Sequence, residues 1–172
     1  LVITIGDSDV ELMVPQAGDD GTQVDEAGLD SPVGSDAASD SEFTSGTITY
    51  DAPDGPATVT IGGVEITGPG QTITGTFGTM TITSVAEGVI EYTYELTTNT
   101  DGDDTEDSFD VVVTDQDGDE ANGTVVIDII DDVPTANPDS DSVTEDGPLI
   151  ADGNVLTGTG GTDANTTDGT AD

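Results

Sequence analysis

Carboxylates are the charged side chains of this sequence, and some of them are spaced as in ion-binding loops. The run Asp115-Gln116-Asp117-Gly118-Asp119-Glu120 places carboxylates at alternate positions around a glycine. Calcium prefers such oxygen ligands, and glycine permits the tight bend by which several oxygens converge on one ion. We therefore expect Asp115, Asp117 and Asp119 to bind Ca²⁺, with an ordinary acidic β-turn as the alternative.

Three further acidic groups are candidates for the same chemistry. They are Asp128, Asp131, Asp132, Asp139, Asp141 and Glu145 around Val133-Pro134, the acidic loop with Asp101, Asp103 and Asp104 that runs on to Asp107, and the pair Asp25 and Glu26. Carboxylates on both sides of a short proline junction can close around the same ions and stiffen it. A solvated acidic surface is the alternative for each group.

The charge balance explains why an external cation is expected at all. The 172 residues include 38 Asp and Glu but no Lys, Arg or His, which gives a formal net charge of -38. An average composition would supply roughly 20 basic residues at this length. Nucleic acids and anionic membranes are excluded as partners, because both require basic residues to neutralise phosphate. High salt or divalent calcium is needed to make such a charge tolerable.

The same composition argues against an enzyme. Without His, Cys or Lys, imidazole, thiolate and Schiff-base chemistry are impossible, and paired carboxylates of the glycosidase type are what remains. Three Phe and three Tyr are too few to line a cleft once the core is filled. No apolar run is long enough to span a membrane, and no basic segment precedes an apolar one, so we expect neither membrane insertion nor a signal peptide in this sequence.

Period-2 alternation predicts an all-β fold. In Val89 to Leu96, Ile90, Tyr92, Tyr94 and Leu96 share one face and acidic or hydroxyl side chains share the other. The other predicted strands are 47–50, 57–61, 71–76, 79–83, 109–114 and 124–130. Their spacing predicts an antiparallel, immunoglobulin-like (cadherin-like) β-sandwich, while residues 31–46 and 135–172 look like loops or segments ordered by neighbours. The expected core is Ile48, Tyr50, Val59, Ile61, Phe77, Met80, Ile82, Ile90, Tyr92, Tyr94, Phe109, Val111, Val113, Val125, Ile127 and Ile129.

Similarity between two segments of the sequence indicates a tandem array. Residues 2–15 and 126–134 both contain a strand-like apolar run, an acidic pair and a Val-Pro step. A chain cut out of an array of repeats would show such similarity at its two ends. We therefore expect residues 1–19 to be the end of a preceding unit or a linker strand, residues 20–134 to form one sandwich repeat, and residues 135–172 to begin the next repeat or an inter-repeat segment.

An ordered series of motifs resembles a known family. The series is Val24-Asp25-Glu26-Ala27-Gly28-Leu29, Ser45-Gly46-Thr47-Ile48, Gly75-Thr76-Phe77-Gly78-Thr79-Met80, Tyr92-Thr93-Tyr94-Glu95-Leu96, Asp107-Ser108-Phe109-Asp110-Val111, Asp115-Gln116-Asp117-Gly118-Asp119 and Asp131-Asp132-Val133-Pro134. It is similar to the repeat modules of giant bacterial adhesins exported by type I secretion, the RTX-adhesin and VCBS-like family. The resemblance implies tandem immunoglobulin-like extender domains at the bacterial cell surface with calcium at their junctions. The glycine-rich RTX nonapeptide is missing, which favours a stalk over a ligand-binding tip.

The sequence thus leads to one main hypothesis and two alternatives. The main hypothesis is a calcium-stabilised repeat of a secreted adhesin or extracellular matrix fibre, acting in cell adhesion and biofilm cohesion, with neighbouring copies of the same repeat as partners. The first alternative is a calcium-dependent module that binds surface polysaccharide. The second is a subunit of an extracellular polymer in which strands are exchanged between copies.

Overall fold

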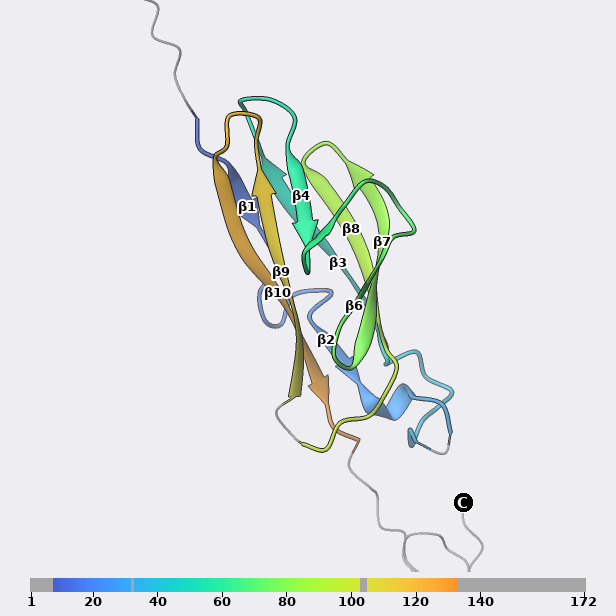
Figure 1. Cartoon of the computed structure of the whole chain (residues 1–172). Helices are drawn as coiled ribbons and strands as arrows, with labels where there is room; N and C mark the ends of the chain where they lie inside the picture. Colours follow the sequence, from blue (N-terminus) through green and yellow to red (C-terminus); the bar gives the residue numbers. More distant parts are fainter. Residues whose placement is uncertain (1–7, 32, 103–104, 133–172) are drawn as a thin grey trace, which may run out of the picture. The chain divides into compact units, whose positions relative to one another are not determined.

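The computed structural model describes residues 8–31, 33–102 and 105–132, which form two five-stranded sheets packed as a sandwich (Figure 1). Sheet 1 has the order β1 (Glu11–Met13), β3 (Phe43–Asp51), β8 (Val89–Leu96), β7 (Gly78–Ala86) and β6 (Thr72–Thr74). Sheet 2 has the order β2 (Gln23–Asp25), β10 (Glu120–Ile130), β9 (Thr105–Thr114), β4 (Thr58–Ile61) and β5 (Val64–Glu65). The pairings are antiparallel except for β2 with β10, and a single 3₁₀ turn, η1 (Glu26–Gly28), follows β2. The all-β sandwich predicted from the sequence is confirmed.

Alternation of buried and exposed side chains fixes which face each long strand turns inward. On β8, Ile90, Tyr92, Tyr94 and Leu96 are at most 1% exposed, and the residues between them face outward or are half-buried. The period of two follows from strand geometry, and the buried face packs against the opposite sheet. The rings of Tyr94 and Phe109 meet edge to face across this interface, with centroids 6.0 Å apart and an interplanar angle of 68°.

The predicted core is largely confirmed. Tyr50 and Phe77 are the exceptions, because both are partly buried at its margin. Leu96, on the alternating face of β8, is also buried. The other additional buried apolar residues come from short or irregular segments that carry little periodicity: Val10, Val24, Leu29, Ile66 and Ile73.

Several strand bounds differ from the sequence prediction. The strands β1, β2 and β5 have two or three residues each, too few for alternation to reveal them. β3 begins at Phe43, inside a stretch predicted as loop, and β9 and β10 begin at Thr105 and Glu120, where the sequence is acidic and polar. Residues 11–13, within the segment predicted as the end of a preceding unit or a linker strand, form β1 and pair with β3.

The two ends of the sandwich carry different connections. At one end, the Ser8 end, the described chain begins at Ser8 beside the β3–β4 and β9–β10 turns (Figure 1). At the other, the Asp132 end, β10 finishes and the described residues stop at Asp132. β10 runs between them for 11 residues, which corresponds to roughly 33 Å. The chain divides after Asp132, and the second unit, 133–172, lies outside the described residues.

Candidate functional site

Three carboxylates converge at the Ser8 end. Asp54 lies in the β3–β4 turn, Asp115 directly follows β9, and Asp117 lies in the β9–β10 turn. One oxygen from each lies within 4.8 Å of the others, a spacing that allows them to share one ion. The structure therefore brings together two residues that the sequence singled out, Asp115 and Asp117, with one that it did not, Asp54.

The β9–β10 turn is built around the side chain of Asp115. Its Oδ1 accepts hydrogen bonds from the backbone N–H groups of Gly118, at 3.0 Å, and Asp119, at 2.8 Å. The backbone N–H of Asp115 donates to the carbonyl of Asp119 at 3.0 Å. Gly118 has φ +106°, a conformation that favours glycine. Asp119 thus contributes backbone groups to the turn, and its carboxylate is outside the three-carboxylate cluster.

The second oxygen of Asp115 is the unusual feature of the site. Asp115 is only 7% exposed, and its Oδ2 is buried without a hydrogen-bond partner in the structure. A charged acceptor that is shielded from solvent without a hydrogen-bond partner is destabilising, so such atoms are rare and need a reason. A cation bound between the three carboxylates would bring a positive charge to this side chain.

The electrostatics keep this carboxyl ionised. Burial by itself would raise the pKa of Asp115, but its interaction with the Asp117 side chain and hydrogen bonds from the backbone N–H groups of Asp119, Gly118 and Asp117 lower the pKa overall. Two like charges 4 Å apart repel by about 1 kcal/mol in water and about 4 kcal/mol at the effective dielectric of a protein surface. Because the chain has no Lys, Arg or His, a positive charge that offsets this repulsion must come from solution.

Contacts between the two turns hold Asp54 in place. Gly55 packs against the side chain of Gln116 so closely that an added Cβ would lie 2.6 Å from Gln116 Oε1. Asp54 Oδ2 also accepts a hydrogen bond from the backbone N–H of Ser8 at 2.6 Å. The sequence around Asp54 reads Pro53-Asp54-Gly55-Pro56, which predicts a turn but not its neighbour in space.

The donor set determines which ion fits. All three ligands are carboxylates, which suit hard cations, whereas zinc and copper favour nitrogen or sulfur donors that this sequence lacks. Ca²⁺ accepts six to eight oxygens in flexible geometry, so water or carbonyl groups can complete its shell around three carboxylates. Mg²⁺ demands near-ideal octahedral geometry and retains its water more strongly. The residues present therefore fit calcium best.

The other predicted ligands that the structure describes gather at the Asp132 end. Asp25 caps η1 by accepting from the N–H of Ala27 at 2.9 Å, and buried Glu26 accepts from the N–H of Thr100 at 2.6 Å. Asp132 accepts from both the N–H and the hydroxyl of Ser35, each at 2.7 Å. These three carboxylates are occupied with hydrogen bonds that tie loops together.

The remaining candidates divide by whether the structure describes them. Asp101 is exposed, and Asp128 and Asp131 are half-buried at the end of β10. Within the described ranges, no three carboxylates at the Asp132 end come close enough to share an ion. Asp103, Asp104, Asp139, Asp141 and Glu145 lie outside the described residues, so calcium binding there stays a prediction.

Asp107, at the start of β9, has a structural role that sequence reasoning missed. It is 2% exposed and accepts four hydrogen bonds. The donors are the N–H groups of Thr76 (2.7 Å), Phe77 (3.0 Å) and Gly78 (3.1 Å) and the hydroxyl of Tyr94 (2.7 Å). These donors belong to the β6–β7 turn, the start of β7 and β8 of sheet 1, so Asp107 joins the two sheets without an ion.

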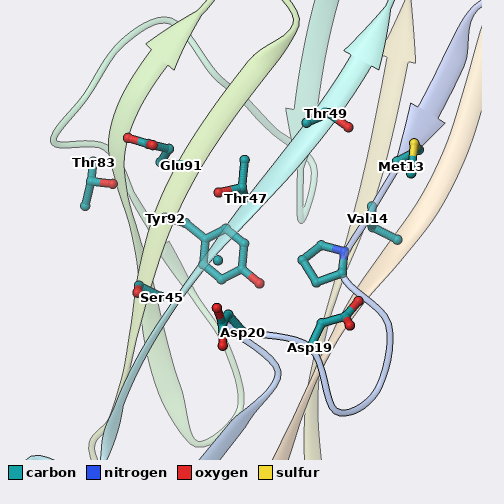
Figure 2. Close-up of a pocket in the computed structure, with 12 residues that line it drawn as sticks. Met13, Val14, Asp19, Asp20, Ser45, Thr47, Thr49, Thr83, Glu91 and Tyr92 are labelled. Carbon is teal, nitrogen blue, oxygen red and sulfur yellow. The ribbon is translucent and has the colours of Figure 1, made fainter.

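A polar groove crosses the outer side of sheet 1. It has a volume of about 760 Å³, and Figure 2 shows it between Met13 and Val14 on one side and Glu91 on the other, with Thr47 and Thr49 of β3 between them. The Tyr92 hydroxyl, at the edge of the groove, donates to the carbonyl of Gly21 at 2.9 Å. The groove therefore offers mainly hydroxyl and carboxylate oxygens, which suit a polyhydroxylated ligand.

Comparison with known proteins adds no assignment. No protein-family model matches the chain, and no curated protein matches it. Within the described ranges, no helix has the length and hydropathy of a membrane span. What is established is a β-sandwich of two five-stranded sheets with a cluster of three aspartates able to hold a metal ion.

Proposed function

We propose that this chain is a calcium-stabilised structural module of a secreted bacterial cell-surface adhesin or extracellular fibre. The observation that carries the proposal is the buried, unpartnered Oδ2 of Asp115 within a three-carboxylate cluster, in a chain without any cationic side chain. Calcium is abundant outside cells and binds extracellular modules with dissociation constants near 10⁻⁴ to 10⁻³ M. Such an ion supplies the positive charge that the sequence lacks.

The strand order supports an immunoglobulin-like form of the sandwich. When β1, β3, β4, β7, β8, β9 and β10 are lettered A to G, sheet 1 contains the order A-B-E-D and sheet 2 the order C-F-G. This is the arrangement of constant-type immunoglobulin domains. β2, β5 and β6 then extend the edges of the two sheets. The family resemblance of the sequence motifs points in the same direction.

The placement of the chain ends in the sandwich supports a spacer role in a tandem array. The described chain begins at the Ser8 end and leaves at the Asp132 end, about one strand length away (Figure 1). A module threaded in this way lengthens a fibre by its long axis each time it is repeated. Neighbouring copies would then be its main partners, and the fibre would act in adhesion and cohesion between cells.

Thermal unfolding tests the calcium dependence of the module. The 172-residue chain is heated in a calorimeter in EDTA, in millimolar Ca²⁺ and in millimolar Mg²⁺ at one fixed ionic strength. A tenfold excess of calcium over the dissociation constant stabilises by about 1.4 kcal/mol per site, which raises Tm by about 5 °C for a domain of this size. Mg²⁺ should produce a clearly smaller rise. Equal melting temperatures in EDTA and calcium would sink the proposal.

A polysaccharide-binding module is the second candidate, favoured by the oxygen-lined groove on sheet 1. Binding to a glycan array that disappears in EDTA and in a Glu91→Gln variant would support it, because Glu91 lines the groove and is not one of the three clustered carboxylates. A calcium-loaded chain that binds no glycan would favour the spacer.

Light scattering of the same sample distinguishes both functions from a strand-exchanged polymer, because strand exchange requires assemblies larger than a monomer.

A further inference from the structure

The three-carboxylate cluster lies where three separate parts of the chain meet. The Ser8 N–H donates to Asp54, Gly55 packs on Gln116, and Asp54 shares the cluster with Asp115 and Asp117. The β3–β4 turn carries the chain from sheet 1 to sheet 2, and the β9–β10 turn belongs to sheet 2. An ion at the cluster would therefore tie together the two turns and, through Asp54, the beginning of the described chain.

Without an ion, the same contacts oppose one another. Asp54 is held toward Asp115 by the packing of Gly55 on Gln116, while the charges of the three carboxylates repel. Apart from the Ser8 contact, the segment is held by the pairing of Glu11 to Met13 with β3 and by packing on the core. Val10 is buried there, and Leu12 and Val14 lie partly buried against it. Local opening of a protein begins where such support is weakest.

The far end of β9 is built differently. Asp107 receives all four of its hydrogen bonds from sheet 1, so closure of the two sheets there requires no ion. Asp107 and Asp115 lie on the same face of the strand, separated by buried Phe109, Val111 and Val113. The carboxylate near the Asp132 end of this strand is thus satisfied by hydrogen bonds alone. The carboxylate that follows the strand at the Ser8 end is suited to an ion.

We propose that calcium at Asp54, Asp115 and Asp117 acts as a local switch: the occupied site fixes residues 8–14 and both turns, and the empty site lets this end open while the Asp107 half stays folded. The inference rests on the calcium binding proposed above and adds where its effect is felt. It makes the beginning of the described chain and the two turns the parts of the sandwich whose local opening responds most to calcium.

Hydrogen–deuterium exchange of the 172-residue chain tests the switch. Backbone exchange is compared in EDTA and in saturating Ca²⁺ at fixed ionic strength. We expect calcium to slow exchange by about tenfold or more in residues 8–14, 52–57 and 115–119, and by less than about twofold in residues 74–78 and 105–109. Isothermal calorimetry on the same sample measures calcium binding independently.

Two substitutions distinguish an effect of the three-carboxylate cluster from an effect of the overall negative charge. Asp115→Asn should abolish the calcium-dependent protection in all three segments, whereas Glu120→Gln, which removes an exposed carboxylate near the same turn, should leave it unchanged. If Asp115→Asn does not fold by circular dichroism, Asp117→Asn replaces it, because Asp117 is exposed and its substitution is tolerated more easily.

The outcomes distinguish this inference from the proposed function. Equal protection of all segments, or calcium binding without protection of residues 8–14, would overturn the switch and leave a calcium-stabilised module standing. Absence of calcium binding would overturn both. Protection confined to the three segments and lost in the Asp115 variant would establish the switch.

Discussion

Asp107 and Asp115 stand at the two ends of the buried face of β9, and the protein satisfies them in different ways. Asp107 accepts four hydrogen bonds from the β6–β7 turn and Tyr94. Asp115 uses Oδ1 within its own turn and keeps Oδ2 buried without a hydrogen-bond partner, next to two more carboxylates. A chain without basic residues can bury a carboxylate either against backbone N–H groups or against an ion from solution, and this strand has a site suited to each.

The largest expected effect is on the Asp107 side. Asp107→Asn replaces an accepting oxygen by an NH₂ group that faces donors, and it should lower the free energy of unfolding by about 3–5 kcal/mol because buried N–H and hydroxyl donors lose their partner. The loss should be the same in EDTA and in calcium, measured by urea denaturation. Asp110→Asn, on the exposed face of the same strand, is the control and should change stability by less than about 0.5 kcal/mol. A loss of stability in Asp107→Asn that appears only in EDTA would contradict the conclusion that Asp107 is satisfied without an ion.

Alkaline pH should also act on this side, with an effect of comparable size at the upper end of the pH range. Burial raises the pKa of Tyr92 to about 12, and burial together with the hydrogen bond to Asp107 and its charge raises the pKa of Tyr94 further. Both hydroxyls stay protonated in the folded chain where an unfolded tyrosine, with a pKa of 10.0, ionises. Stability should be complete below pH 10 and fall between pH 10 and 12 by up to about 1.4 kcal/mol per pH unit for each tyrosine.

Urea denaturation across that pH range measures the loss. Tyr94→Phe should flatten the slope, because one of the two groups no longer ionises. An unchanged slope in this variant would show that Tyr94 is not linked to stability as its burial implies.

On the Asp115 side, the expected change depends on calcium. Asp115→Asn should remove about 1.4 kcal/mol of calcium-dependent stabilisation at a tenfold excess of ion over the dissociation constant. In EDTA the variant should be no less stable, since losing one negative charge relieves repulsion in the cluster. The difference in Tm between calcium and EDTA, compared with that of Glu120→Gln, gives the result. A full calcium effect in Asp115→Asn would place the ion elsewhere.

The smallest effect concerns the contact between the two turns at the Ser8 end. Gly55 and Gly118 have φ +134° and +106°, so alanine should cost about 1 kcal/mol at either position. An added Cβ at Gly55 meets Gln116, whereas at Gly118 it meets nothing within 4 Å. Gly55→Ala should therefore lower calcium affinity a few-fold, and Gly118→Ala should lower it less. Equal affinities, measured by calorimetry, would show that the Gly55–Gln116 contact does not support the site.

How far the sequence predicts this molecule depends on the range of each interaction. Alternation in Val89 to Leu96 gave the bounds of β8 and its buried face, because strand periodicity is local. β1, β2 and β5 were missed, since segments of two or three residues form strands only through their partners. The turn at Asp115 to Asp119 was recognisable from its own residues, and it forms by hydrogen bonds within itself.

Composition and local pattern by themselves determined that the chain is all-β, that it contains no cation of its own, and that Asp115 and Asp117 lie in a loop suited to calcium. Only the tertiary structure brought Asp54 to that loop and gave Asp107 its four donors, which come from the other sheet. Asp107 on β9 and Asp115 directly after it continue one inward-facing alternation, so the alternation alone does not tell how each carboxylate is satisfied. What separates them is which segments, distant in sequence, the folded sandwich places opposite each one.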